Sequence, residues 1–371
     1  MKNSLALLIC HCLLLVGCTG MTKSDVAVDE LFFDEEGAFD GESPAFTFIP
    51  LETTEKNLLS YITKVKIVDD RIFILDANHI NETMHVYDMD GKFITQIGAK
   101  GNGPGEYKGA YDFHIDEIAQ TITVTDTWTQ NLIVYDLNTY RYISRKNIPF
   151  GFSTYITLPD GYYAWYSISG FKKAMDYYYV QITDSLFNIT NYLYPADFVR
   201  HYGIGGNPFY RFNNKTYFYK QFNPVVYEIT ADDIKPHYQF SLKKDMLPPL
   251  EFLISNSPND TDYSRALFNS NYIQQYSFLE TEQFILLCYH VNKSTKVIVY
   301  DKKEKKYHRY ADFPDNIYEF TFIGTYKDNF IAYISSSNIK KPSTMKNDEL
   351  QLLSEKRTEE DNPILCLIKF K

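Results

Sequence analysis

The chain has 371 residues, with 37 Lys and Arg against 47 Asp and Glu and a formal net charge of −10. So acidic a protein is not attracted to nucleic acid or to anionic lipid headgroups, so neither is expected as a partner. Only Cys18, Cys288 and Cys366 follow the first 17 residues, which excludes a disulfide framework, so stability must come from a hydrophobic core. The last two lie in apolar runs and are expected to be buried thiols, although a disulfide between them stays open.

The first 18 residues read MKNSLALLICHCLLLVGC. Lys2 supplies a positive start, and an apolar run extends from Leu5 to Val16. A helix this short cannot cross a hydrocarbon layer of about 30 Å. The segment therefore predicts a cleaved export signal over residues 1–17.

The ending Leu15-Val16-Gly17-Cys18 resembles the lipobox of bacterial lipoproteins. That resemblance implies that Cys18 becomes the N-terminus and carries acyl chains. We then expect an anchor in the outer membrane, at its periplasmic or its surface face, because two or more acyl chains hold a protein stably on a bilayer. The alternative is an ordinary signal peptide with an incidental cysteine.

An acidic segment follows the cysteine. Residues 19–45 hold eight Asp and Glu against the single Lys23 and few large apolar residues. This composition predicts a flexible, solvated tether over residues 18–45, ahead of a folded domain over residues 46–371. An acidic stretch at this place also resembles the surface-export signal of some Gram-negative lipoproteins, and a plain spacer is the alternative.

Short strand-like runs rich in Tyr and Phe recur through the rest of the chain. The acidic ends of five of these runs lie 48, 48, 44 and 73 residues apart, at Asp88, Asp136, Asp184, Glu228 and Asp301. Units of this length with four short antiparallel strands are typical of β-propeller blades. We predict an all-β, six-bladed propeller, with five or seven blades, a β-sandwich pair and a β-solenoid as alternatives.

Two interruptions and a closing strand complete this prediction. The 73-residue interval between Glu228 and Asp301 contains a helical or irregular insertion near residues 242–268. A second polar helical stretch lies near residues 345–358. The run from Ala45 to Leu51, AFTFIPL, is placed to pair with the last blade. Such pairing would close the ring and leave no long unpaired edge.

The most distinctive motif is GAKGNGPGEYKG, from Gly98 to Gly109. It lacks the GxxxxGK[ST] string of a phosphate-binding loop, its proline has no N–H to donate, and strands rather than a helix follow it. The chain around this motif shows a fixed order: a strand, the string DxxGKF, a second strand and the string GxGPGEY. This order resembles that of NHL-like or TolB-like six-bladed propeller lipoproteins of Gram-negative gut anaerobes. The resemblance implies a crossover between blades, without an activity, at the matching residues Gly101, Gly103, Pro104, Gly105, Glu106 and Tyr107.

The chain carries no familiar catalytic or metal-binding motif. HExxH, GxSxG and CxxC are absent, and the histidines lack metal-ligand spacing. We therefore predict no cofactor, no metal and no catalytic residue. Aromatic and basic groups beside glycines favour ligand contacts at His201, Tyr202 and Arg211, and a predicted hairpin tip adds Trp128. The alternative is a long connection whose aromatic residues pack on the next blade.

These observations favour a membrane-anchored, non-enzymatic binding or scaffold propeller whose partner is a protein or a glycan. The first alternative is an exported lyase or hydrolase with an active site at the propeller axis. It requires His, Arg and carboxylate side chains from three or more blades to meet at one axial mouth. A structural subunit of an outer-membrane assembly is the second alternative.

Overall fold

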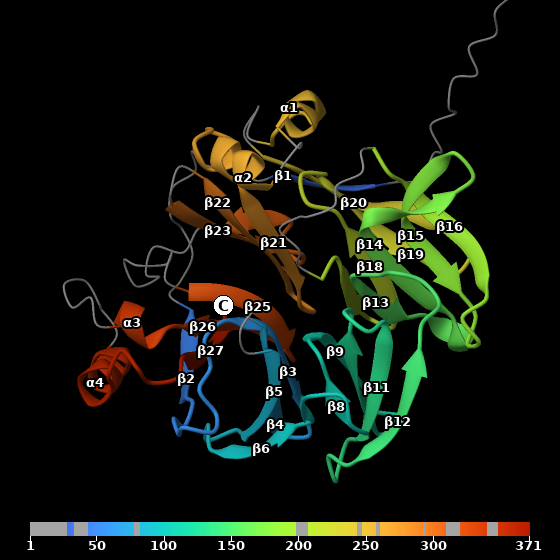
Figure 1. The fold of residues 1–371 in the computed structure, drawn as a ribbon. Helices are drawn as coiled ribbons and strands as arrows, with labels where there is room; N and C mark the ends of the chain where they lie inside the picture. The colour runs from blue at the N-terminus through green and yellow to red at the C-terminus, as the bar shows by residue number, and fades with distance from the viewer. Residues whose placement is uncertain are drawn as a thin grey trace, which may run out of the picture.

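The structure, a computed structural model, describes residues 28–32, 44–77, 82–197, 207–242, 247–256, 260–291, 294–308, 320–339 and 348–371. Six sheets, each with four antiparallel strands, surround a common axis as the blades of a propeller (Figure 1). Five blades take these four strands from one unit of the repeat, and the sixth takes one of them from the N-terminal part of the chain. The predicted fold, with six blades rather than five or seven, is confirmed. Neither a β-sandwich nor a solenoid describes the chain.

The first three blades follow one another along the chain with their first strand innermost. Blade one contains β3 (Ile62–Val68), β4 (Arg71–Ala77), β5 (Glu82–Asp88) and β6 (Phe93–Ile97). Blade two contains β9 (Ala110–Asp116), β10 (Thr121–Asp126), β11 (Asn131–Asp136) and β12 (Tyr142–Asn147). Blade three contains β13 (Thr154–Thr157), β14 (Tyr163–Lys173), β15 (Asp176–Thr183) and β16 (Ile189–Pro195), with the short 3₁₀ helix Pro159–Gly161 between its first two strands.

The last three blades carry the additions to the repeat. Blade four contains β17 (Phe209–Phe212), β18 (Lys215–Tyr219), β19 (Val225–Ile229) and β20 (Ile234–Ser241). Blade five contains β21 (Gln275–Glu280), β22 (Phe284–Val291), β23 (Ser294–Asp301) and β24 (Lys306–His308). Blade six contains β25 (Phe320–Tyr326), β26 (Asn329–Ile334), β27 (Ile364–Lys369) and β2 (Ala45–Pro50).

Helices occur at the two predicted interruptions. α1 (Leu250–Ser255) and α2 (Asp260–Phe268) lie between blades four and five, within the expected insertion. α3 (Ser336–Ile339) and α4 (Asp348–Lys356) lie between the second and third strands of blade six. Both pairs lie at the periphery of the ring in Figure 1.

The periodic acidic residues of the sequence have a local cause. Asp88, Asp136 and Asp301 each end the third strand of a blade, and Asp184 directly follows the third strand of blade three. In each case the Oδ1 atom accepts two backbone N–H groups of the hairpin that follows. This Asx turn satisfies donors that the sheet leaves unpaired and so fixes the hairpin to the outer strand. Blade four departs from the pattern, because Thr230 rather than Glu228 caps the turn there.

The hydrophobic core is a ring of seams rather than one central mass. Each of the six interfaces between neighbouring blades holds one cluster of buried apolar side chains. The seam between blades five and six includes Cys288 and Cys366, which are buried free thiols. Burial raises the pKa of the Cys288 thiol to about 12, so this thiol is inert at neutral pH.

The glycine-rich stretch connects blade one to blade two. It runs from the end of β6 through two-residue strands β7 (Ala99–Lys100) and β8 (Glu106–Tyr107) to β9, the inner strand of the next blade. Glu106 accepts the N–H of Gly103 at 2.7 Å. Gly98 has a φ of +66°, and a Cβ there would lie 2.4 Å from the Tyr135 hydroxyl. The stretch thus folds on itself and on blade two, with no helix beside it to bind a phosphate.

Part of the expected tether is folded. Residues 29–32, within the segment predicted to be flexible, form β1 (Asp29–Phe32), which pairs in parallel with β20 at the outer edge of blade four. Leu31 is 2% exposed and joins the seam between blades four and five. The expectation of a solvated tether is therefore wrong for these four residues. Backbone pairing and one buried leucine outweigh the acidic composition around them.

The ring closes through strands from opposite ends of the chain. β2 pairs with β27 over six residues, from Ala45 opposite Lys369 to Pro50 opposite Ile364, as predicted. Asn362 then ties the segment after β2 to blade six. Its Nδ2 donates to the carbonyls of Glu52 and Asn57, and its Oδ1 accepts the N–H of Leu59.

We predict that Asn362→Ala lowers the free energy of unfolding by about 3 kcal/mol, because it removes three hydrogen bonds that contribute about 1 kcal/mol each. The N–H of Leu59 loses its acceptor, whereas the carbonyls of Glu52 and Asn57 keep a second donor. Urea denaturation followed by tryptophan fluorescence measures the change. Asn138→Ala, on an exposed hairpin of blade two, is the control and should cost under about 1 kcal/mol. Equal losses for the two variants would contradict a special role in ring closure.

Candidate functional site

Four blades meet around one buried carboxylate at the axis. Asp112 lies on β9, and its side chain is 6% exposed. It accepts hydrogen bonds from Lys64 Nζ of blade one at 2.6 Å, from the Thr154 hydroxyl of blade three, and from Asn207 Nδ2, just before β17 of blade four, at 3.1 Å. Its own strand adds the N–H of Phe113 at 2.7 Å.

These contacts decide what Asp112 can do. Burial alone would raise the pKa of Asp112, but the Lys64 ammonium beside it outweighs burial and holds the pKa well below its usual value. A carboxylate has about four lone-pair directions, and four donors occupy them. Asp112 is thus a fixed anion that joins blades, and it is a poor general base near neutral pH.

His114 follows Asp112 on the same face of β9. Its Nε2 lies 3.3 Å from Asp112 Oδ2 but lacks the alignment of a hydrogen bond. Its ring packs on Tyr155 of blade three, with the centroids 4.1 Å apart. Burial, with Lys64 nearby, lowers the pKa of His114, so we expect a neutral imidazole at pH 7.

Two further cations lie near this carboxylate. Lys66 lies two residues after Lys64 on β3. Its side chain is accessible to solvent, but the protein around it limits the hydration of its ammonium group. Burial lowers the pKa of Lys66 to about 8, with further contributions from Lys64 and Arg211. Arg211, on β17, donates through Nη2 to the carbonyl and, at 2.9 Å, to the hydroxyl of Thr157.

The two predicted ligand contacts that the structure describes lie on different blades. Arg211 lies on an inner strand, whereas Trp128 is 75% exposed at the hairpin between β10 and β11, against Gly109. His201 and Tyr202 lie outside the described residues. The axial requirement of the enzyme alternative is met only in part, since Asp112 and His114 come from one blade.

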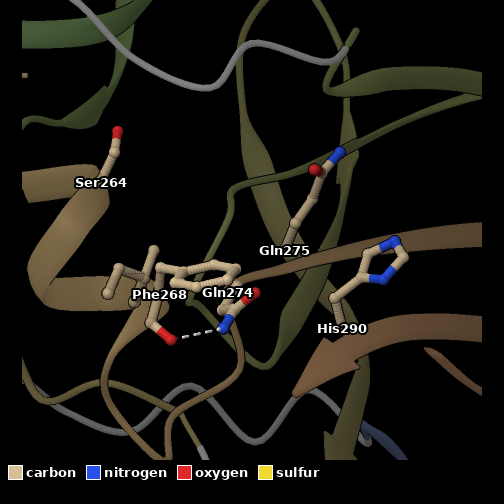
Figure 2. A pocket seen from close by; sticks show the side chains of 6 residues that line it. Ser264, Phe268, Gln274, Gln275 and His290 are labelled. Atoms are coloured by element: carbon tan, nitrogen blue, oxygen red, sulfur yellow. Dashed lines mark hydrogen bonds between the residues drawn. The ribbon is translucent and has the colours of Figure 1, made fainter. Parts of the chain in front are cut away.

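A separate open pocket lies beside blade five. Its volume is about 310 Å³, and Figure 2 shows residues of α2 facing residues of β21 and β22 across it. Phe268 is 51% exposed, and its carbonyl accepts a hydrogen bond from Gln274 Nε2 at 3.2 Å. The lining residues are Ser264, Leu267, Phe268, Gln274, Gln275 and His290.

A narrower pocket next to this one lies between blades five and six. It measures about 40 Å³, shares Gln275 and His290 with the larger pocket, and reaches Phe320 and Phe322 of blade six. Burial lowers the pKa of His290, whose Nδ1 lies 2.8 Å from the Thr295 hydroxyl. The two pockets together offer aromatic, amide and neutral imidazole groups.

Sequence reasoning missed the axial carboxylate and this pocket. The available signal was the pair of alternating polar residues in otherwise apolar inner strands, Lys64-x-Lys66 and Asp112-x-His114. No comparable signal marked the pocket, because the insertion was predicted without a position relative to blade five.

Within the described residues there is no group of three or more His, Cys, Asp and Glu arranged to hold a metal ion. None of the described helices is long and apolar enough to span a membrane.

Comparison with known proteins agrees with the geometry. Residues 20–333 match the model of the family DUF5128, described as a 6-bladed β-propeller. The chain belongs to this family. No curated protein matches it.

Two solved structures show how far the likeness extends. A protein of Bacteroides fragilis that is predicted to be exported is 26% identical, with a TM-score of 0.82 over 92% of this chain and 99% of that one. A DUF4221 family member from Bacteroides vulgatus is 12% identical, with a TM-score of 0.57 over 90% of this chain and 98% of its own, and shows the fold alone. The chain is therefore a six-bladed propeller similar to an exported Bacteroides protein.

We predict that Asp112→Ala lowers the free energy of unfolding by about 3–5 kcal/mol at pH 7, because it leaves Lys64 without its partner. The double variant Asp112→Leu with Lys64→Met should recover much of this loss. The depressed pKa means that the contribution of Asp112 is present above about pH 4 and is lost as the pH falls toward its folded-state pKa. Denaturation at pH 7 and 3.5 should show the gap narrowing in acid, and a constant gap would contradict the ionic role.

Proposed function

We propose that this protein is a lipid-anchored envelope protein whose propeller binds a saccharide without transforming it. The observation that carries the proposal is the open pocket between α2 and blade five, the pocket under α2. Phe268 offers an exposed aromatic face, and Gln274 and Gln275 contribute amides next to it. Sugar rings present an apolar face to aromatic side chains and hydroxyl groups to amides, and a pocket of this size suits one or two sugar units.

Binding is favoured over catalysis by the state of the axial carboxylate. An axial hydrolase or lyase needs a general acid or base whose pKa lies near the working pH. Asp112 is held ionised by four donors, and the pKa of its neighbour His114 is lowered. These contacts give Asp112 and His114 a structural role, which is to hold neighbouring blades together.

The anchor is proposed from the lipobox-like ending at Cys18 and from the likeness to an exported protein. β1 begins 11 residues after Cys18, a span of at most about 40 Å when fully extended. Because β1 is paired to the outer edge of blade four, the folded domain would stay within that distance of the bilayer at its rim.

We predict that Cys18→Ala releases the protein from the membrane fraction when the full chain is expressed in a Gram-negative host. The acyl chains require this cysteine, and no other part of the proposal holds the domain on lipid. Cys12→Ala, within the export signal, is the matched control and should stay with the membrane. Retention of Cys18→Ala in the membrane fraction would overturn the anchor.

We predict that Phe268→Ala weakens saccharide binding by about tenfold or more, because the stacking face is removed. A glycan array identifies the saccharide, and titration calorimetry measures the affinity. Leu250→Ala removes a comparably exposed apolar side chain from α1, outside the pocket, and should leave the affinity unchanged. Binding by both variants at the wild-type affinity would exclude this pocket as the site.

A further inference from the structure

Among the described residues, three cations lie near the axis beside two carboxylates. Lys64, Lys66 and Arg211 lie near one another, with Asp112 and Glu117 as the nearby anions. Of the three cations only Lys64 is bonded to Asp112, which four donors already satisfy. Among the residues that the structure describes, neither Lys66 nor Arg211 forms an ion pair. Such an excess is notable in a chain with a net charge of −10.

The topology explains why these cations meet. Lys64 and Lys66 are two residues apart on β3 and therefore share one face of the strand. Lys64 Nζ reaches blade two, where it also donates to the Phe113 carbonyl at 2.7 Å. Arg211 reaches from blade four back to Thr157, the last residue of β13 in blade three. Side chains from opposite blades thus converge beside the inner edges of blades two and three.

Mutual repulsion among these cations costs free energy. Lys64 and Arg211 both lower the pKa of Lys66, so the three cations repel one another. An anion between them would relieve that repulsion and gain charge-assisted hydrogen bonds. Only Nη2 of Arg211 has a protein acceptor within the described residues, so its other N–H groups remain available to a ligand.

The geometry points to a binding site for the oxyanion group of a small ligand, a carboxylate or a sulfate, between Lys66 and Arg211. The planar guanidinium of Arg211 can donate two parallel hydrogen bonds to such a group, and Lys66 adds a mobile point charge. Lys64 strengthens the local potential while it stays bonded to Asp112. The site shares no residue with the pocket under α2, and it stands whether or not that pocket binds sugar.

Titration calorimetry of the full-length protein tests the site with D-glucuronate, sodium sulfate and D-glucose. Glucuronate and glucose differ only at the carboxylate, so we expect binding of glucuronate or sulfate and none of glucose at this site. Lys66→Gln and Arg211→Gln should each weaken oxyanion binding by about tenfold or more. Lys172→Gln on β14 is the control for the loss of one charge. Phe268→Ala is the control that separates this site from the sugar pocket. Both variants should bind the oxyanion with the wild-type affinity.

The pH dependence gives an independent readout. Binding should weaken between pH 7 and 9.5, because Lys66, whose pKa is about 8, loses its charge over that range. The charged and titratable groups around Lys66 are Lys64, Asp112, His114, Glu117 and Arg211. Lys66→Gln should therefore abolish most of the pH dependence.

Three results would overturn the inference. The first is failure of the wild type to bind either oxyanion at millimolar concentration. The second is binding of glucose as tightly as glucuronate by Phe268→Ala, in which the sugar pocket is impaired, and the third is unchanged oxyanion affinity in Lys66→Gln. Lys66 makes no hydrogen bond in the described residues, so its variant should fold even if Arg211→Gln does not.

Discussion

The pairing of β2 with β27 is the interaction on which the rest of this propeller depends. Each blade covers its apolar faces with its two neighbours, so an open row of blades would leave one face of the first and one face of the last exposed. Closure gives these two blades a shared seam, and the N-terminal strand supplies the outer edge of blade six. Asn362 strengthens this junction because it bonds groups on both sides of it. The ring is thus held by a contact between residues more than 300 positions apart.

Closure also creates the chemistry of the axis. Six inner strands that face one axis have no strand partner on their inner side, so their backbone groups need side chains or water. Lys64 and Arg211 meet part of this need by donating to carbonyls of blades two and three. Asp112 balances one cation and binds blades three and four as well. The remaining positive charge is therefore a product of how the ring satisfies its inner edges.

The parts of the structure that could be predicted from the sequence are those set by local bonds. The periodic aspartates are visible because each caps the hairpin next to it, and the glycine-rich stretch is visible because its turns need positive φ angles. Asp112 was missed because its partners Lys64, Thr154 and Asn207 lie 48, 42 and 95 residues away, one to a blade. β1 was missed for a related reason: only the seam between blades four and five makes Leu31 a buried residue.

The position of β1 also bears on how a ligand would reach the protein. Asn207, Thr154 and Gln275 lie at the starts of inner strands, so Asp112 and the pocket under α2 belong to the same end of the ring. Arg211 contacts Thr157, at the opposite end of β13. β1, in contrast, pairs with β20, the strand farthest from the axis in blade four. The proposed anchor would therefore attach the ring by its rim, and β1 itself covers neither feature. The route of the chain into the domain is thus compatible with anchoring and ligand access at the same time.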